Sequence, residues 1–271
     1  MAGGLYMETR GRGPELVLLH GWGLHGGVWD TLMPRLTARF RVTRVDLPGH
    51  GLSRGTAMSA ELGAAAQQLL VAVPADAVWL GWSLGGLLAL RAALDAPENM
   101  RALILANTTP RFITATDWPH AMPPEQLQEF ALGLQQDYRE TLLRFLSLQV
   151  RGDEAARASL RQLREALFAR GEPDTVSLAA GLELLRRSDL RAELARISMP
   201  TLVIAGGYDR LTPPGAGEAM ARAIPGARHA LIAKSAHAPF ISHAEEFIQA
   251  LGGFMADAMQ SGSSGRSDEC A

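Results

Sequence analysis

Short apolar segments alternate with stretches of helical spacing along most of this 271-residue chain. The first candidate strand, at residues 5–9, is a short edge segment. The others are mostly apolar runs and span residues 15–19, 41–45, 77–80, 101–106, 201–205 and 229–233. Runs that are apolar on both faces are typical of parallel strands covered by helices on both sides. The pattern therefore predicts one large α/β domain built on a mostly parallel sheet.

Between residues 110 and 196 the strand pattern stops. Apolar residues recur there at helical spacing, first at Leu142, Phe145 and Leu148, and then at Ala156, Leu160, Leu163 and Leu167. We interpret this as a helical insertion after the sixth strand, placed over the carboxyl edge of the sheet as a lid. The predicted organisation is a core over 1–111, a lid over 112–196, a second core segment over 197–259 and a flexible tail over 260–271.

A Gly-x-Ser-x-Gly motif follows the candidate strand at 77–80, as Gly81-Trp-Ser83-Leu-Gly85, and a Leu- and Ala-rich helix comes directly after it. In this strand–turn–helix context the motif indicates a nucleophile elbow, a strained turn that exposes the serine hydroxyl. Since 28 residues are glycine, the motif alone is weak evidence. It predicts Ser83 as a nucleophile only if a base and an acid accompany it.

Candidate partners stand after the last two predicted strands. Asp209 follows the strand at 201–205, and His237 follows the strand at 229–233. Serine, acid and histidine in this order are what an elbow-type sheet requires, and the histidine would activate Ser83 by taking its proton. The strand at 101–106 ends in the amide Asn107 rather than an acid. Asp46 fits a structural turn better, although it is the next acid to consider.

Attack of Ser83 on a carbonyl group would create an oxyanion, which two backbone N–H donors are expected to stabilise. One is expected at Leu84, directly after the nucleophile, and the other at Trp22 in the Gly-rich loop after the strand at 15–19. The indole rings of Trp22 and Trp82 would then form apolar walls near Ser83 and favour an apolar acyl chain.

Composition narrows the possible partners and cofactors. A net charge of −2 gives no general attraction to nucleic acid or anionic membranes. The chain contains no run of 18 apolar residues, the length that would suggest a membrane-spanning helix. The single cysteine, Cys270, excludes an internal disulfide and makes a cysteine metal site implausible. We expect a cytoplasmic monomer with no metal and no cofactor.

Several motifs together resemble a known family. His20-Gly-Trp-Gly, Asp46-Leu-Pro-Gly-His-Gly, the elbow sequence and Ala236-His-Ala-Pro-Phe-Ile-Ser-His243 are similar to those of the α/β-hydrolase superfamily. More narrowly they resemble the pimeloyl-[acyl-carrier protein] methyl ester esterases of biotin synthesis, as does the lid segment 144–149. The resemblance implies catalysis by Ser83, Asp209 and His237, oxyanion donors at Trp22 and Leu84, and substrate contacts at Trp82 and Phe145. It also implies acyl-carrier protein as the partner.

The lid carries a set of arginines that fits such a partner. Arg157, Arg161 and Arg164 share one face of a predicted helix, and Arg144 lies in the preceding helix. A basic ridge beside an apolar seam suits docking of an acidic carrier protein. Because 25 of the 26 basic residues are arginine, a merely solvated helix face is the alternative.

Three functions therefore remain open from the residues. The first is a serine esterase that cleaves a short-to-medium acyl methyl ester carried on acyl-carrier protein. The second is a lidded hydrolase of free small molecules, such as a carbon–carbon bond hydrolase, a lactonase or a general short-chain esterase. The third is a non-catalytic receptor that keeps the fold.

Overall fold

The computed structural model describes residues 4–264 and contains a seven-stranded sheet of order β1-β3-β2-β4-β5-β6-β7. The edge strand β1 runs antiparallel to β3, and every other neighbouring pair is parallel. The strands are β1 Met7–Arg10, β2 Glu15–Leu19, β3 Arg41–Val45, β4 Ala77–Trp82, β5 Met100–Ala106, β6 Thr201–Gly206 and β7 Arg228–Ile232. The α/β class and the mostly parallel sheet are confirmed.

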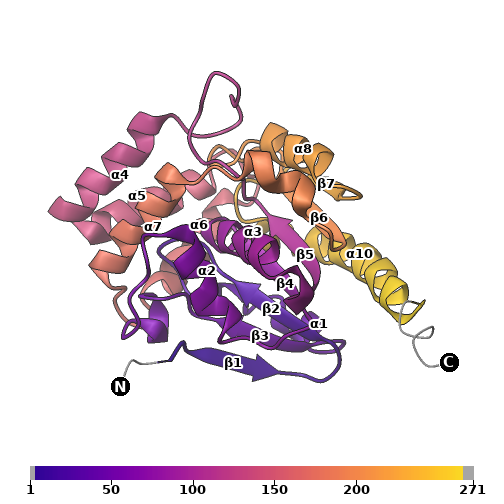
Figure 1. Ribbon diagram of the computed structural model, residues 1–271. Coiled ribbons are helices and arrows are strands. Elements are labelled where there is room, and N and C mark those ends of the chain that lie inside the picture. Colours follow the sequence, from indigo (N-terminus) through magenta and orange to yellow (C-terminus); the bar gives the residue numbers. More distant parts are fainter. Residues whose placement is uncertain (1–3, 265–271) are drawn as a thin grey trace.

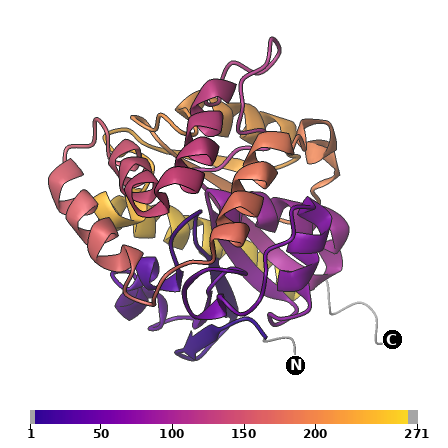
Figure 2. The same ribbon diagram turned by 90° about the vertical axis from the view of Figure 1, so that its left-hand side faces the viewer.

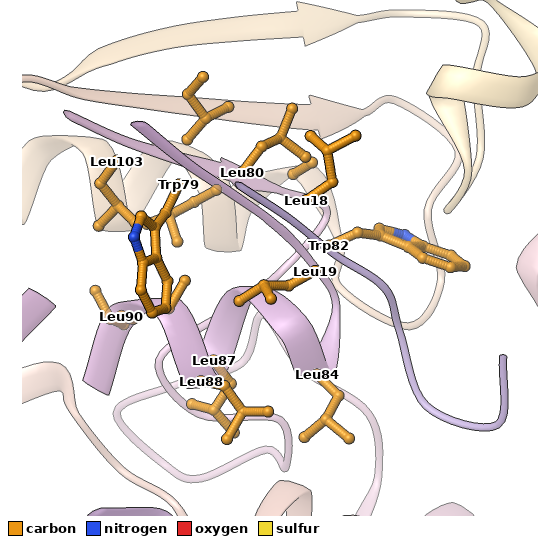
Figure 3. Packing of buried hydrophobic residues seen from close by; sticks show 14 of the residues in the cluster. Leu18, Leu19, Trp79, Leu80, Trp82, Leu84, Leu87, Leu88, Leu90 and Leu103 are labelled. Atoms are coloured by element: carbon orange, nitrogen blue, oxygen red, sulfur yellow. The ribbon is translucent and has the colours of Figure 1, made fainter. Parts of the chain in front are cut away.

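Helices cover both faces of the sheet because its central strands are apolar on both sides (Figure 1). In β4, Gly81 lies against α3 (Leu84–Asp95) and Trp79 points to the same face, where Figure 3 shows Leu90 of that helix beside it. Helices α2, α3 and α8 share this face, whereas α1 and α10 cover the other. The bounds are α1 Met33–Leu36, α2 Leu62–Leu70, α3 Leu84–Asp95, α8 Pro214–Ala223, α9 Pro239–Ser242 and α10 Ala244–Ser264.

Four helices form a cap between β5 and β6, and Figures 1 and 2 show them gathered on one side of the sheet. They are α4 Pro124–Gln136, α5 Tyr138–Gln149, α6 Ala156–Leu167 and α7 Thr175–Arg187. The cap follows the fifth strand rather than the sixth, so that expected strand number is wrong. Only five segments before the cap have a strand pattern, and the structure forms strands at those five.

Short 3₁₀ helices complete the connections, at η1 Gly26–Trp29, η2 Gly51–Ser53, η3 Pro97–Asn99 and η4 Arg191–Arg196. Helix α10 continues to Ser264, so residues 260–264 of the expected tail are helical. The remainder of that predicted tail, with Cys270, lies outside the described residues. Among the residues that the structure does describe, no helix has both the length and the apolarity needed to cross a membrane.

Candidate active site

Ser83 occupies the turn between β4 and α3 in a strained backbone conformation, with φ 55° and ψ −119°. The turn is possible only because glycines flank it. A Cβ on Gly81 would lie 2.4 Å from the Gly85 carbonyl oxygen, and one on Gly85 would lie 2.5 Å from the His20 carbonyl oxygen. Strain of this kind, about 1–3 kcal/mol per residue, persists where the surrounding structure holds it and is concentrated at active sites.

Asp209 follows β6 and is buried with both carboxylate oxygens fully used. Oδ1 accepts the backbone N–H groups of Leu211 at 2.8 Å and Thr212 at 3.0 Å. Oδ2 accepts the Thr212 hydroxyl at 2.6 Å and lies 2.7 Å from His237 Nδ1. Burial opposes ionisation of this carboxyl, but the facing His237 and the hydrogen bonds outweigh it, so the pKa of Asp209 lies below its usual value.

His237 lies in the loop after β7 and is 1% exposed. Because its Nδ1 faces an ionised carboxylate, the proton of a neutral ring belongs on Nδ1 and Nε2 keeps its lone pair. Among the described residues, Nε2 has no hydrogen-bond partner, so it is not bonded to Ser83 in this structure. Serine–histidine hydrogen bonds of hydrolases are often long before substrate binds. The site thus holds an oriented imidazole with one nitrogen that has no partner among the described residues.

Asn107 is a member of this site that sequence reasoning did not identify. It follows β5 with φ 43°, and its Nδ2 donates to Asp209 Oδ2 at 2.7 Å and to the Ala236 carbonyl oxygen at 3.1 Å. The amide therefore joins the acid loop to the residue before His237. Its place directly after a central strand was the available signal, but an amide at that position suggested only the lack of an acid.

The two predicted oxyanion donors lie at the carboxyl ends of neighbouring strands. Leu84 is the first residue of α3, and Trp22 lies in the loop after β2. In the described part of the chain, neither backbone N–H donates to a protein acceptor. The loop passes close to Ser83, since a Cβ on Gly21 would be 3.2 Å from the Cβ of Ser83. Both N–H groups are thus without a protein acceptor among the described residues, and their role as oxyanion donors stays a prediction.

Two neutral histidines hold the Trp22 loop in place. His20 accepts the Leu47 backbone N–H through Nε2 at 2.9 Å, and its Nδ1 lies 2.8 Å from the Gly21 carbonyl oxygen. His50 accepts the Gly23 N–H through Nε2 at 3.2 Å. Burial lowers the pKa of both rings, and this favours the neutral forms that can accept these hydrogen bonds.

The two indole rings expected near Ser83 pack against different parts of the protein. Trp22 packs edge-on against Phe145 of the cap, with ring centroids 4.9 Å apart, and its Nε1 donates to the Leu178 carbonyl oxygen at 2.8 Å. Trp82 instead points to the α10 face, where its ring packs against Phe240 at 4.9 Å. Its Nε1 donates to the His237 carbonyl oxygen at 2.7 Å. Trp82 therefore supports the loop that carries His237, and a substrate wall formed by Trp22 and Trp82 stays a prediction.

The four arginines predicted to dock a carrier protein lie on the outer surface of the cap. Arg144 on α5 and Arg157, Arg161 and Arg164 on α6 are all exposed, while Leu163 and Leu167 of α6 are buried. The apolar seam of α6 therefore packs inward and its arginines face out. No cluster of three or more His, Cys, Asp or Glu side chains suited to a metal ion occurs among residues 4–264.

Comparison with known proteins identifies the family. A family described as the alpha/beta hydrolase fold matches residues 14–244. The pimeloyl-[acyl-carrier protein] methyl ester esterase of Xanthomonas oryzae pv. oryzae (strain MAFF 311018) is 46% identical over 252 residues, which cover 93% of this chain and 99% of that protein. The chain belongs to the α/β-hydrolase family, among the pimeloyl-[acyl-carrier protein] methyl ester esterases.

Solved structures of α/β-hydrolases have the same architecture. A hydrolase from Pseudomonas aeruginosa PA01 is 32% identical with a TM-score of 0.77, and the match covers 93% of this chain and 94% of that one. The enol-lactonase from Burkholderia xenovorans LB400 is 25% identical with a TM-score of 0.81, covering 93% and 96%. The fold of this chain is thus shared with a lactonase as well as with another bacterial hydrolase.

Proposed function

We propose that this α/β-hydrolase is a carboxylic ester hydrolase that cleaves the methyl ester of pimeloyl-[acyl-carrier protein] in biotin synthesis. The observation that carries the chemistry is the buried Asp209–His237 pair, 2.7 Å apart, beside a strained serine elbow. The family relationship supports the choice of ester, because relatives that align over nearly their whole length carry this name.

The proposed cycle uses the free nitrogen of His237 twice. Nε2 takes the proton of Ser83 as Oγ attacks the ester carbonyl, and the N–H groups of Leu84 and Trp22 stabilise the oxyanion. The protonated ring then gives its proton to the departing methoxy oxygen, which leaves as methanol. A water molecule, deprotonated by the same nitrogen, attacks the acyl-enzyme and releases the free carboxylate and Ser83. Asp209 holds the ring and stabilises its positive form.

The acyl chain would lie beneath the cap, beside Trp22 and Phe145. Ser83 is only 4% exposed and Trp22 only 1% exposed, so substrate has little access to either residue in this arrangement. We therefore propose that the cap, over the segment 112–196, is a lid that must shift before substrate enters. Closing it excludes water and strengthens the electrostatic interactions of the site.

The cap arginines are the proposed docking surface for acyl-carrier protein. Within the described residues, Arg144, Arg157 and Arg164 form no ion pair, and Arg161 has only a 4.0 Å contact with the exposed Glu165. Exposed cations without close carboxylates attract an acidic partner and speed its association. The proposal includes action as a monomer in the cytoplasm, where this carrier-bound substrate would be met.

The test compares a methyl ester on the carrier with a p-nitrophenyl ester of the same acyl group. Replacing Arg157→Glu and Arg161→Glu should lower kcat/KM for the carrier-bound ester at least about tenfold, which is about 1.4 kcal/mol. The p-nitrophenyl ester should change within about twofold. The matched control, Arg12→Glu with Arg39→Glu, reverses two exposed charges at the amino ends of the strands and should leave both activities unchanged.

The same experiment decides against the other functions. Equal activity of the wild type on both esters, with no effect of the arginine variant, would favour a hydrolase of free small molecules. The shared fold of the enol-lactonase makes this the second candidate. If the wild type cleaves neither ester and so does not differ from Ser83→Ala, a non-catalytic receptor would be the remaining function.

A further inference from the structure

The turn between α5 and α6 contacts both loops of the proposed triad. The Gln149 carbonyl oxygen, at the end of α5, accepts the backbone N–H of His237 at 2.9 Å. Gly152 in the same turn lies against Tyr208, the residue before Asp209, since a Cβ on this glycine would be 3.5 Å from that of Tyr208. Through this one turn the cap thus contacts two loops. They are the base loop, which carries His237 after β7, and the acid loop, which carries Asp209 after β6.

Asp153 is the buried charged residue of this turn, with 7% of its surface exposed. Its Oδ2 accepts the backbone N–H of Ala236 at 3.0 Å, one residue before His237. Its Oδ1 accepts the N–H of Ala155 at 2.7 Å, and its carbonyl oxygen accepts that of Ala156 at 3.1 Å, where α6 begins. One residue therefore holds both the start of the arginine-bearing helix and the backbone beside the base.

We infer that Asp153 is a positioning residue for the general base, acting through the backbone of Ala236. The inference rests on the proposed function because it takes His237 as the base. Asp209 and the Trp82 indole fix the ring and carbonyl of His237, and the cap supplies acceptors for two successive N–H groups on its amino side. Hydrogen bonds to a charged acceptor are about twice as strong as neutral ones. A shift of about 1 Å in a catalytic group can cost about 100-fold in rate.

Two variants of Asp153 and one control test this role with substrates that do not need the carrier. Asp153→Ala removes both side-chain acceptors, whereas Asp153→Asn keeps one acceptor oxygen. Glu154→Ala is the matched control, since Glu154 is the next residue but lies at the surface, 2.9 Å from Lys234. The measurements are kcat and KM for a p-nitrophenyl ester, and the rate constant for phosphonylation of Ser83 by a fluorophosphonate.

We expect Asp153→Ala to lower kcat about tenfold or more, with KM within about twofold, because the base is misplaced while the acyl site is intact. Phosphonylation should slow by the same factor, since it also needs the Ser83 proton removed. Asp153→Asn should lie between Asp153→Ala and wild type, and Glu154→Ala should match wild type. If the alanine variant does not fold, the asparagine variant carries the test.

The inference is overturned if the Asp153 variants keep wild-type rates, or if Glu154→Ala loses as much. It is also overturned if the melting temperature falls while kcat, expressed per active site counted by fluorophosphonate titration of a parallel sample, is unchanged, because Asp153 would then be only structural. A wild-type enzyme that fluorophosphonate does not label would contradict the proposed function itself, and so is distinguishable from these outcomes.

Discussion

The base loop and the Trp22 loop each depend on a buried histidine, but the two rings are bonded differently. His237 places Nδ1 against the Asp209 carboxylate, and its Nε2 has no partner among the described residues. His50 has both nitrogens on backbone groups, since Nε2 accepts from Gly23 and Nδ1 lies 2.9 Å from the Pro48 carbonyl oxygen. An imidazole with no free nitrogen cannot exchange a proton with substrate. His50 therefore positions a loop, while His237 can act as a base.

The largest effect is expected when His237, the histidine with the free nitrogen, is removed. His237→Ala should lower kcat for any ester by at least about 1,000-fold, because the proton of Ser83 then has no acceptor. His243→Ala is the matched control, since that ring lies 2.8 Å from the Ser242 hydroxyl and outside the triad. Kinetics on a p-nitrophenyl ester measure both. Near-normal turnover of His237→Ala, or a comparable loss in the control, would assign the base elsewhere.

A slightly smaller loss is expected at the carboxylate. Asp209→Asn should reduce kcat by about 100- to 1,000-fold, because the amide can favour the wrong tautomer of His237 and removes its charge partner. Asp46→Asn is an informative comparison, since Asp46 is also buried but accepts from the Gly26 and Leu52 backbone N–H groups. We expect Asp46→Asn to lower the melting temperature more than the rate. If Asp46→Asn lowered kcat more than Asp209→Asn does, Asp46 would be the acid of the triad and Asp209 the structural carboxylate.

The Trp22 loop should respond chiefly in stability. His50→Ala leaves the Gly23 N–H without its acceptor, a cost of about 1–3 kcal/mol for a buried donor. That corresponds to a melting temperature lower by about 2–10 °C in a domain of this size. We expect kcat to fall only about tenfold, through a less ordered oxyanion donor at Trp22. Thermal unfolding and kcat measured on the same sample decide, and a 1,000-fold rate loss would place His50 in the chemistry.

The smallest effect sharpens the contrast through pH. Burial, followed by the neighbouring His50, lowers the pKa of His20 well below the usual value. Below about pH 6.5 the unfolded chain binds a proton at this ring and the folded protein does not, so stability falls as pH drops. The limit is about 1.4 kcal/mol per pH unit for each such histidine. Unfolding of His20→Gln between pH 5 and 7 should show a shallower slope than wild type, and an equal slope would contradict this.

The sequence contained enough to predict the sheet and the proposed triad, because each depends on local pattern. Apolar runs defined the strands, and Ser83, Asp209 and His237 each follow a strand directly. Their convergence then follows from parallel topology, since carboxyl ends of parallel strands meet at one edge. The side of Trp82 was also available from strand alternation, because it shares a face with Leu80 and not with Trp79.

Residues that contact distant parts of the chain could not be found in this way. Asp153 and Ala236 are 83 positions apart, and Asn107 and Asp209 are 102 apart. Neither contact leaves a periodic signal, because the partner of Asp153 is a main-chain N–H that every residue except proline carries. Asp153 is identified only once the cap is placed over the sheet, and Asn107 only once the loops after β5 and β6 lie side by side.

The bond from Asp153 to Ala236 has a consequence for exchanging caps between related hydrolases. The cap is one continuous segment, so a graft between β5 and β6 would seem to alter only substrate selection. In this protein the segment also supplies the acceptors for two main-chain groups of the base loop. A transplanted cap without an equivalent carboxylate would leave the Ala236 N–H unsatisfied. Chimeras should therefore be designed with the turn at 149–155 retained from the recipient, so that specificity changes without loss of the base.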